Sequence, residues 1–563
     1  MKIRPNIDLS SIQSTNVNHL PIISYYAQQM GFEKIINELV PTKMEVDPGK
    51  IVLGMVIDIL SGRTPLYHLE DSFNQMDCEL LLGEELPDGY FSDDNVGRVL
   101  KHIYEAGTQK IFSAISVAVV NTFNVSTHQV HFDTTSVSLF GQYLNSLKDG
   151  SPFEITYGYS KDKRPDLKQF ILSLLCVEGN IPILGKINSG NASDKTLNNN
   201  LLSNISNHMK KMGVEDDAFI YVADSAVVTE DNLELMTNSH PFVTRLPATY
   251  NECERVIIDA VEAEQWQDIG TVAQVKATVH RPNASYRVYN GQVILYEQEF
   301  RAVVVHSSAH DKRRHNRLKR EVEKSLKSIK ELKKLCEKQS FACLEDALSA
   351  AEKETRNSTA FHQMNINITE KHRYASGRPK KGTVRTPIET RYVLSVTIIE
   401  DVVALEKQRK IAGCFVLLTN IPNEPDTEYT AERILRIYKE QNGIEKNFSF
   451  LKDDQIVNAL FLKLPEHIEA LGMILIIALM LWRLMERAMR NNLEKNNTTL
   501  SGWNKQPTQR PTAYMLTWKF KGITVLALGK QRQVSGSLSV TQVEFLTALN
   551  MTANSFINPM GTG

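Results

Sequence analysis

The chain has 563 residues, of which 42% are apolar and 8% aromatic, so it is long and apolar enough to form several domains with separate cores. Its formal net charge of −1 excludes a uniformly basic nucleic-acid-binding protein and leaves local basic segments as the places where a polyanion would bind. The six cysteines form no C-x-x-C pair, so neither a disulfide framework nor a zinc cluster is indicated, and a reducing cytoplasm fits.

No segment of the sequence predicts export or a membrane span. The first residues are followed by polar sequence without the apolar stretch of a signal peptide, so secretion is not expected. The longest apolar run, at 470–482, has thirteen residues, whereas a helix needs roughly 20 to cross a bilayer. We therefore expect this run to be a buried helix of a soluble protein.

Residues 1–125 are expected to form a helical N-terminal domain. The run at 49–60 is apolar apart from Lys50 and Asp58, and Ser92 is placed to cap a helix over 96–106. No metal-binding or nucleophile pattern occurs in this region. The sequence therefore predicts an accessory role for this domain, either in DNA binding or in dimerisation.

The pattern changes to strands at about 126, and residues 126–246 form the first part of the expected catalytic core. Three strands in succession are predicted first, and then helices alternate with two more strands. The strands are expected at 129–140, 169–177, 181–187, 218–224 and 241–246, and the helices near 196–212 and 229–237. This is the order of an RNase H-like sheet, with Asp133 on the central strand and Asp224 at the end of its neighbour.

Residues 247–390 have a different pattern of predicted strands and helices and are expected to form an insertion. Strands are predicted at 272–279, 286–289, 293–297 and 300–306, with Asn290-Gly291 as a hairpin turn. Apolar positions at 318–336 then follow a helical spacing, and Ser340 is placed to cap a second helix, which predicts a helical hairpin. The first of these helices is basic, because 311–338 holds twelve Lys or Arg and five Asp or Glu.

The chain then returns to the core. A buried strand at 413–420, a helix bearing Glu445 and a long helix at 470–490 are expected to complete it over 391–500. Residues 501–563 have no clear pattern and receive no role. The expected fold class is therefore α/β and multidomain: an RNase H-like catalytic domain interrupted by a mixed strand and helical-hairpin insertion, preceded by an α-helical N-terminal domain.

One helical face carries the most informative spacing. Tyr438, Gln441, Glu445 and Lys452 stand at relative positions 0, 3, 7 and 14, so on a single helix they share a face. Phosphoryl transfer with two divalent ions about 4 Å apart needs oxygen ligands from several carboxylates. Each aspartate alone is more often a turn or cap residue, but Asp133, Asp224 and Glu445 together supply such a set.

These residues resemble a known family, the bacterial insertion-sequence transposases of the DDE type, in the group marked by Y-(2)-R-(3)-E-(6)-K. The motifs that carry the resemblance are His131-Phe-Asp133-Thr-Thr-Ser, Val222-Ala-Asp224-Ser-Ala and Tyr438-x2-Gln441-x3-Glu445-x6-Lys452. The stretch from Gly158 to Gln169 is similar to one found in a branch of that group. The resemblance extends over about 20 to 490.

The resemblance implies roles for individual residues. Asp133, Asp224 and Glu445 would bind two ions of Mg²⁺ or Mn²⁺, while Tyr438, Gln441 and Lys452 would contact DNA. Gln441 departs from the signature, which has Arg there, and a neutral amide loses a charge-assisted phosphate contact. Gly443 weakens the helix by about 1 kcal/mol relative to Ala, so a bend between Tyr438 and Glu445 is expected.

The activity implied by the resemblance is that of a transposase in the bacterial cytoplasm, associated with the nucleoid. It would bind the terminal inverted repeats of its element as a homodimer, hydrolyse the phosphodiester at each end and join the 3′ hydroxyl to target DNA. A DNA hairpin step is implied by the resemblance alone. Two alternatives stay open, namely an RNase H-like nuclease without strand transfer and a non-catalytic DNA-binding descendant of a transposase.

A short basic segment is a further candidate for DNA contact. Arg378, Lys380 and Lys381 lie in Gly-Arg-Pro-Lys-Lys-Gly, which resembles an arm that inserts Arg into the minor groove. The alternative is a flexible basic linker.

Overall fold

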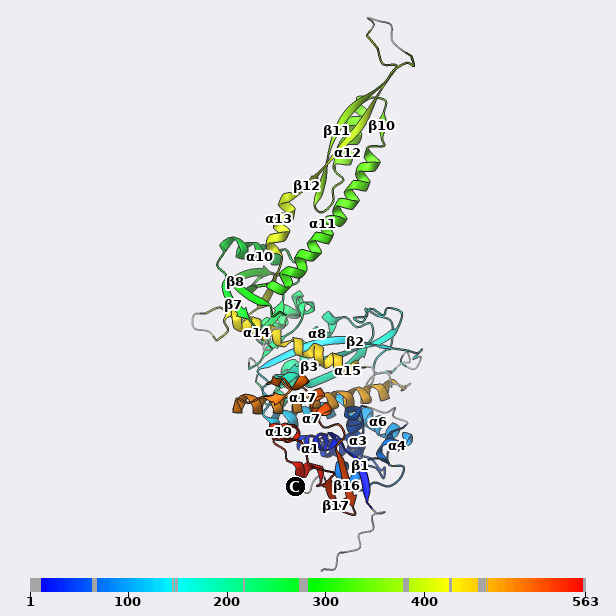
Figure 1. The fold of residues 1–563 in the computed structure, drawn as a ribbon, viewed down its shortest axis with the longest axis vertical. Helices are drawn as coiled ribbons and strands as arrows, with labels where there is room; N and C mark the ends of the chain where they lie inside the picture. Colours follow the sequence, from blue (N-terminus) through cyan, green and yellow to red (C-terminus); the bar gives the residue numbers. More distant parts are fainter. Residues whose placement is uncertain are drawn as a thin grey trace, which may run out of the picture. The chain divides into compact units, whose positions relative to one another are not determined.

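The computed structural model describes residues 12–62, 68–143, 146, 150–215, 218–272, 282–377, 384–424, 428–453, 462 and 464–559. The fold is α/β and multidomain, and the chain divides into two compact units (Figure 1). Unit 1 consists of Met1–Thr244 and Ile437–Gly563, and unit 2 of Arg245–Arg436. The insertion expected at 247–390 therefore falls in unit 2, together with the strand at 413–420 that was expected in the core.

The N-terminal region of unit 1 is helical apart from one short strand, β1 (Gln13–Asn16). Its helices are α1 (Leu20–Met30), α2 (Phe32–Leu39), α3 (Pro48–Ser61), α4 (Leu69–Phe73), α5 (Cys78–Leu82), α6 (Asp93–Ala106) and α7 (Thr108–Phe123). The apolar run predicted as a helix is confirmed as α3, which is buried along almost its whole length. Ser92 is the N-cap of α6 by backbone position, but its side chain makes no capping hydrogen bond.

The sheet of unit 1 has the strand order β4-β3-β2-β5-β6. Its strands are β2 (Gln129–Leu139), β3 (Lys168–Val177), β4 (Ile181–Ser189), β5 (Ile220–Val222) and β6 (Phe242–Arg245). Neighbouring strands among β2, β3 and β4 pair antiparallel, whereas β5 pairs parallel with β2 and β6 parallel with β5. The predicted meander of three strands is confirmed, and β2 is the central strand.

Two helices follow the meander in the predicted places, α8 (Asp194–Lys211) and α9 (Glu230–Ser239). The expected core helix is α17 (Pro465–Asn496), which packs against β4, α3 and α6 (Figure 1). By length and composition alone α17 would be able to cross a membrane, but 94% of its most apolar stretch is buried inside the fold. A Cβ at Gly472 would lie 2.6 Å from Ile187 Cδ1, so any side chain there would displace Ile187 where α17 packs on β4.

The C-terminal residues, to which the sequence assigned no role, pack on the N-terminal region of unit 1. They form β14 (Leu500–Ser501), β15 (Pro507–Thr508), α18 (Ala513–Lys519), β16 (Thr524–Leu528), β17 (Gln531–Val534) and α19 (Val540–Ala548). Strand β16 pairs antiparallel with β1. The Arg532 guanidinium lies 2.7 Å from both Asp77 and Glu79, and its side chain is only 3% exposed. The two ends of the described chain are therefore held in one unit.

Unit 2 contains a strand group in the order β13-β9-β8-β7. Its elements are β7 (Gln267–Thr271), β8 (Ser285–Leu295), β9 (Gln298–Ser307), β13 (Cys414–Thr419), α10 (Asn251–Ala263) and α13 (Val402–Ile411). Most of the strand predicted at 272–279 lies outside the described residues.

The hairpin predicted at Asn290-Gly291 is wrong. Both residues lie inside β8, paired with Val303 and Ala302 of β9. The turn is formed instead by Tyr296 and Glu297, both of which have positive φ. A Cβ at Gly291 would lie 2.7 Å from a methyl group of Val256, so this glycine makes room for α10.

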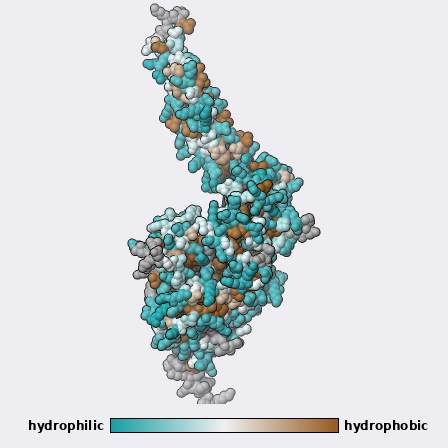
Figure 2. Space-filling model, turned by 180° about the vertical axis from the view of Figure 1, so that it is seen from behind, coloured by the Kyte–Doolittle hydropathy of each residue, from teal (hydrophilic) through white to brown (hydrophobic). Residues whose placement is uncertain are grey.

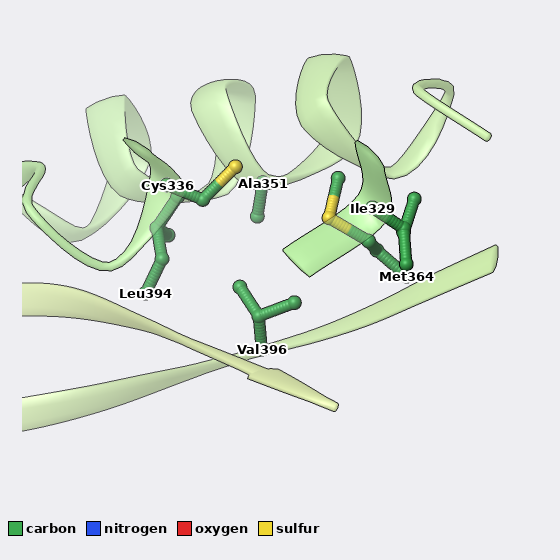
Figure 3. Close-up of a cluster of buried hydrophobic side chains, with 6 residues drawn as sticks. All are labelled: Ile329, Cys336, Ala351, Met364, Leu394 and Val396. Atoms are coloured by element: carbon green, nitrogen blue, oxygen red, sulfur yellow. The ribbon is translucent and has the colours of Figure 1, made fainter. Parts of the chain in front are cut away.

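The rest of unit 2 is a helix pair packed on a long β-hairpin. Its elements are α11 (Ser308–Cys336), β10 (Ser340–Phe341), α12 (Leu344–Thr355), β11 (His362–Arg373) and β12 (Glu389–Glu400). Figure 3 shows the buried cluster that joins them, formed by Ile329, Cys336, Ala351, Met364, Leu394 and Val396. The predicted apolar face of α11 is therefore confirmed. The predicted cap is wrong, because Ser340 lies in β10 and the Cys343 side chain caps α12.

Candidate active site of clustered carboxylates

Asp133 and Asp224 lie on neighbouring strands of the unit 1 sheet. In the parallel pairing of β2 with β5, His131 is opposite Val222, and each aspartate comes two residues later in its own segment. Asp224 lies two residues after the end of β5 and caps a short turn, its carboxylate accepting a hydrogen bond from the Ala226 amide at 3.0 Å. The strand order thus brings the two predicted aspartates to one edge of the sheet.

Burial gives this pair an unusual charge state. It raises the pKa of the Asp133 carboxyl to about 7, and the Asp224 and Asp194 carboxylates add to that rise. The Lys161 ammonium opposes it. The pKa of Asp224 is also raised, chiefly by burial and further by Asp194. Among the described residues, this edge therefore brings together three carboxyl groups, of Asp133, Asp194 and Asp224, and one ammonium group, of Lys161.

Lys161 and Asp194 are members of this cluster that the sequence did not reveal. Asp194 is the first residue of α8, and its two carboxylate oxygens accept from Thr134 Oγ1 at 2.5 Å and face Lys161 Nζ at 3.1 Å. Lys161 Nζ also donates to the carbonyl and hydroxyl oxygens of Thr134, both at 2.8 Å, and lies 4.0 Å from Asp133. The only signal in the sequence was the Gly158 to Gln169 stretch that contains Lys161.

Glu445 lies on an exposed face of α15 (Asn442–Leu451), which packs against β2. The single helix expected from Tyr438 to Lys452 is wrong. Helix α14 (Ala431–Glu440) ends before Gln441, whose amide donates to the Tyr438 carbonyl three residues back, and Lys452 is the C-cap of α15. Among the described residues, no three His, Cys, Asp or Glu side chains form a ready metal-binding group, so Glu445 is not gathered with the aspartates.

A buried polar network fixes α15 on the sheet and on α17. The Asn447 side chain is fully buried and donates to the Asn180 carbonyl at 2.8 Å. Its amide oxygen accepts from Arg483 at 2.6 Å, and Arg483 pairs with the buried Glu486 at 2.6 Å. The sequence gave no sign of these contacts, because the partners come from three separate segments.

Gly443 has a different role from the one expected. A Cβ at this position would lie 1.8 Å from the Asn180 side chain, so glycine allows α15 to lie directly on the turn that joins β3 to β4. The expectation that Gly443 merely weakens a continuous helix is therefore replaced by a packing requirement. The helix is interrupted in this region, but at Gln441.

The residues expected to contact DNA are only partly described. Lys452 Nζ donates to Asp162 at 2.6 Å, so it is ion-paired within unit 1, and Tyr438 and Gln441 are half-buried. Arg378, Lys380 and Lys381 lie outside the described residues. DNA contact by all of these groups remains a prediction.

A cavity of about 1210 Å³ lies on the other face of the same sheet. It is lined by α7, α8 and strands β2 to β4, with Phe132 of β2 among its walls. Because successive side chains of a strand point to opposite faces, Asp133 points away from this cavity. The cavity and the carboxylate cluster are therefore separate features.

The comparisons with known proteins are sparse. The family profile of a domain of unknown function, DUF4277, matches residues 12–117, which cover β1 and the helices up to most of α7. No curated protein matches the chain. The matched part is the N-terminal helical region and does not include the aspartates.

Proposed function

We propose that the chain is a DDE-type transposase whose catalytic domain has an RNase H-like fold. The observation that carries the proposal is the pairing of Asp133 and Asp224 at one edge of the sheet, in a half-buried cluster to which the described residues contribute more carboxylates than cations. The strand order β4-β3-β2-β5-β6 supports it, because the antiparallel meander and the two parallel strands are those expected of an RNase H-like sheet.

The chemistry of the cluster fits divalent metal ions. Its side chains offer oxygen donors, which Mg²⁺ and Mn²⁺ prefer, and the pKa of Asp133 is raised chiefly by burial and further by the neighbouring Asp224 and Asp194 carboxylates. We assign the metal to Asp133, Asp224 and Glu445. Two ions bound there would activate the attacking oxygen and stabilise the leaving oxygen of a phosphodiester.

The chain's own residues would arrange these ligands. The Thr134 amide donates to Asp133 at 2.7 Å and holds the carboxylate in place, while the Ala226 amide does the same for Asp224. The hydrogen bonds of Asn447 hold α15 beside β2 and so fix the position of the Glu445 backbone. To join Asp133 and Asp224 at a metal ion, the exposed Glu445 side chain would have to move toward them.

DNA is the proposed partner, in the form of the element's terminal inverted repeats and the target. A basic segment in unit 2 is a candidate for this contact: residues 311–338, nearly all of which belong to α11, hold twelve basic and five acidic residues. Figure 2 shows a mostly hydrophilic surface with scattered hydrophobic groups on this part of the molecule. Such a helix suits the sequence-independent binding of phosphates. A homodimer on DNA and a bacterial cytoplasmic location complete the proposal.

Strand transfer is the test that separates the proposal from its alternatives. The purified protein would be incubated with Mg²⁺, a supercoiled target plasmid and labelled DNA that carries the sequences flanking its own gene. The proposal predicts cleavage at the element ends and label joined to the plasmid, both lost in Asp133→Asn and Asp224→Asn. Cleavage without joining would indicate a nuclease, and end binding without cleavage in Mg²⁺ or Mn²⁺ would indicate a non-catalytic descendant.

A further inference from the structure

The loop from Gly158 to Gln169 carries two adjacent residues of opposite charge that reach two different elements. Lys161 extends to the carboxylate cluster, 3.1 Å from Asp194. Asp162 extends to the end of α15, where it accepts a hydrogen bond from Lys452 Nζ at 2.6 Å. Glu445 is on the same helix, two turns before Lys452.

Hydrogen bonds fix the two ends of this loop, which carries the contacts of Lys161 with Asp194 and of Asp162 with Lys452. The amides and carbonyls of Thr156 and Gln169 exchange hydrogen bonds at 3.2 and 2.9 Å. The buried Gln169 side chain donates to the Gly190 carbonyl at 2.8 Å, and a Cβ at Gly158 would lie 2.1 Å from that same oxygen. These contacts explain why the stretch begins with Gly and ends with Gln.

The middle of the loop is fixed to β2 as well. The Lys161 amide donates to Ser136 Oγ at 2.9 Å, so the backbone at Lys161 is attached to the strand that bears Asp133. The loop therefore touches β2 through its backbone, the carboxylate cluster through one side chain and α15 through the next. A displacement of α15 would therefore be transmitted to the carboxylate cluster through Asp162 and Lys161.

We propose that Lys161 and Asp162 are positioning residues of the catalytic site, which together tie the end of α15 to the carboxylate cluster on β2. Lys161 supplies the positive charge that holds the carboxylates together before divalent ions bind. Asp162 keeps α15 in the place from which Glu445 joins the site. The catalytic part of this inference rests on the proposed function, whereas the contacts and their effect on α15 do not.

The role of Lys161 is tested by thermal unfolding in EDTA and in Mg²⁺. Lys161→Met should lower the Tm by about 2–4 °C in EDTA, because the clustered carboxylates then repel one another without compensation. Lys161→Arg should keep most of the Tm, and Asp194→Asn in the Lys161→Met background should restore part of it. Lys163→Met is the matched control, since Lys163 is an exposed residue of the same loop, and should behave as the wild type.

Mg²⁺ separates this inference from the proposed function. If the metal site exists, Mg²⁺ should reduce the Tm deficit of Lys161→Met, because the ion supplies the missing positive charge. A deficit that persists unchanged in Mg²⁺ would count against the metal site and leave the result in EDTA standing. A Lys161→Met protein with the Tm of the Lys163→Met control in EDTA would overturn the role of Lys161.

The role of Asp162 is tested by amide hydrogen exchange in 445–452 and by turnover. Asp162→Asn should accelerate exchange there and lower turnover about tenfold, with the KM for element ends unchanged, because a misplaced ligand affects the reaction more than binding. Asp162→Glu should restore both. Unchanged exchange in Asp162→Asn would overturn the positioning role, whether or not the protein proves to be a transposase.

Discussion

Burial decides which titratable residues of this protein keep their charge. It raises the pKa of Asp133 to about 7 and lowers the pKa values of His19 and His131 to about 4. Asp133 lies among carboxylates and suits a cation, whereas His19 serves the fold, since its Nε2 donates to the Leu60 carbonyl at 2.9 Å. The same physical effect thus raises the pKa of a carboxyl at the proposed metal site and imposes a structural requirement for neutral imidazole elsewhere.

His19 should make the stability of the protein depend on pH. The folded state keeps the imidazole neutral down to about pH 4, whereas the unfolded state takes up a proton near pH 6.5. Its stabilisation is therefore complete above pH 6.5 and is lost as the pH falls toward 4, by about 3 kcal/mol. Urea unfolding at pH 7.5 and 4.5 should show a smaller pH dependence for His19→Gln. The partly exposed His102→Gln is the control, and equal pH dependence in both variants would contradict the assignment.

At the residue scale, the sequence predicted what strand patterns can reveal. Asp133 and Asp224 were found because alternating and apolar runs mark strands, and strands place their residues in known relations. Lys161 and Asp194 were not found, because a loop and a helix start reach the cluster only through tertiary packing. Gln441 was identified as a departure from the signature, and the structure adds that the helix breaks there.

At the scale of elements, the proposed site depends on how α15 packs against the turn at Asn180 and against α17. Gly443 lies against Asn180, and the buried Asn447 joins that turn to Arg483 of α17. Because a buried charge without its partners is costly, these contacts favour one position of α15 over neighbouring ones.

Gly443→Ala should therefore be destabilising, although alanine favours helices. The added Cβ would meet the Asn180 side chain at 1.8 Å, and the required shift should cost about 1–3 kcal/mol. Gly97→Ala in α6 is the matched control, since a Cβ there meets nothing within 4 Å and should stabilise by about 0.5–1 kcal/mol. Urea unfolding of both variants measures the difference. A stabilised Gly443→Ala would mean that α15 is not seated on this turn.

Element prediction succeeded where periodicity decides and failed where packing decides. The strands β2 to β6 and the apolar face of α11 were predicted from alternation and helical spacing. The Asn290-Gly291 turn was wrong because Gly291 is needed beneath α10, so its flexibility was misread as a turn signal. The continuous helix through Gln441 was wrong because the sequence spacing alone does not reveal a break in hydrogen bonding.

At the scale of the whole molecule, unit 1 is assembled from segments far apart in the chain. The C-terminal strands and helices, unpredictable in role from their uneven pattern, close on the N-terminal helices through β1 and through Arg532. Helix α17 runs through the same unit as its apolar core. The region matched by DUF4277 is thus part of one compact unit with the proposed catalytic sheet.

Arg532 should carry much of the attachment of the C-terminal segment. Arg532→Met removes a buried guanidinium and leaves Asp77 and Glu79 facing each other, which should cost about 3–5 kcal/mol. Lys34→Met is the control, because the Lys34 to Glu38 pair is exposed and its loss should leave the unfolding midpoint unchanged. Limited proteolysis within 521–549 should accelerate in Arg532→Met. Equal midpoints for the two variants would show that β16 and β17 do not depend on this pair.

The central claim is that Asp133, Asp224 and Glu445 hold divalent metal, and Fe²⁺ in place of Mg²⁺ tests it most directly. With ascorbate and peroxide, bound Fe²⁺ produces radicals that cut the polypeptide next to the metal. On DNA ends, the account predicts cuts near Asp133, Asp224 and Glu445, suppressed by excess Mg²⁺ and absent in the Asp133→Asn, Asp224→Asn double variant. Cuts that avoid all three segments, or that persist in the double variant, would contradict it.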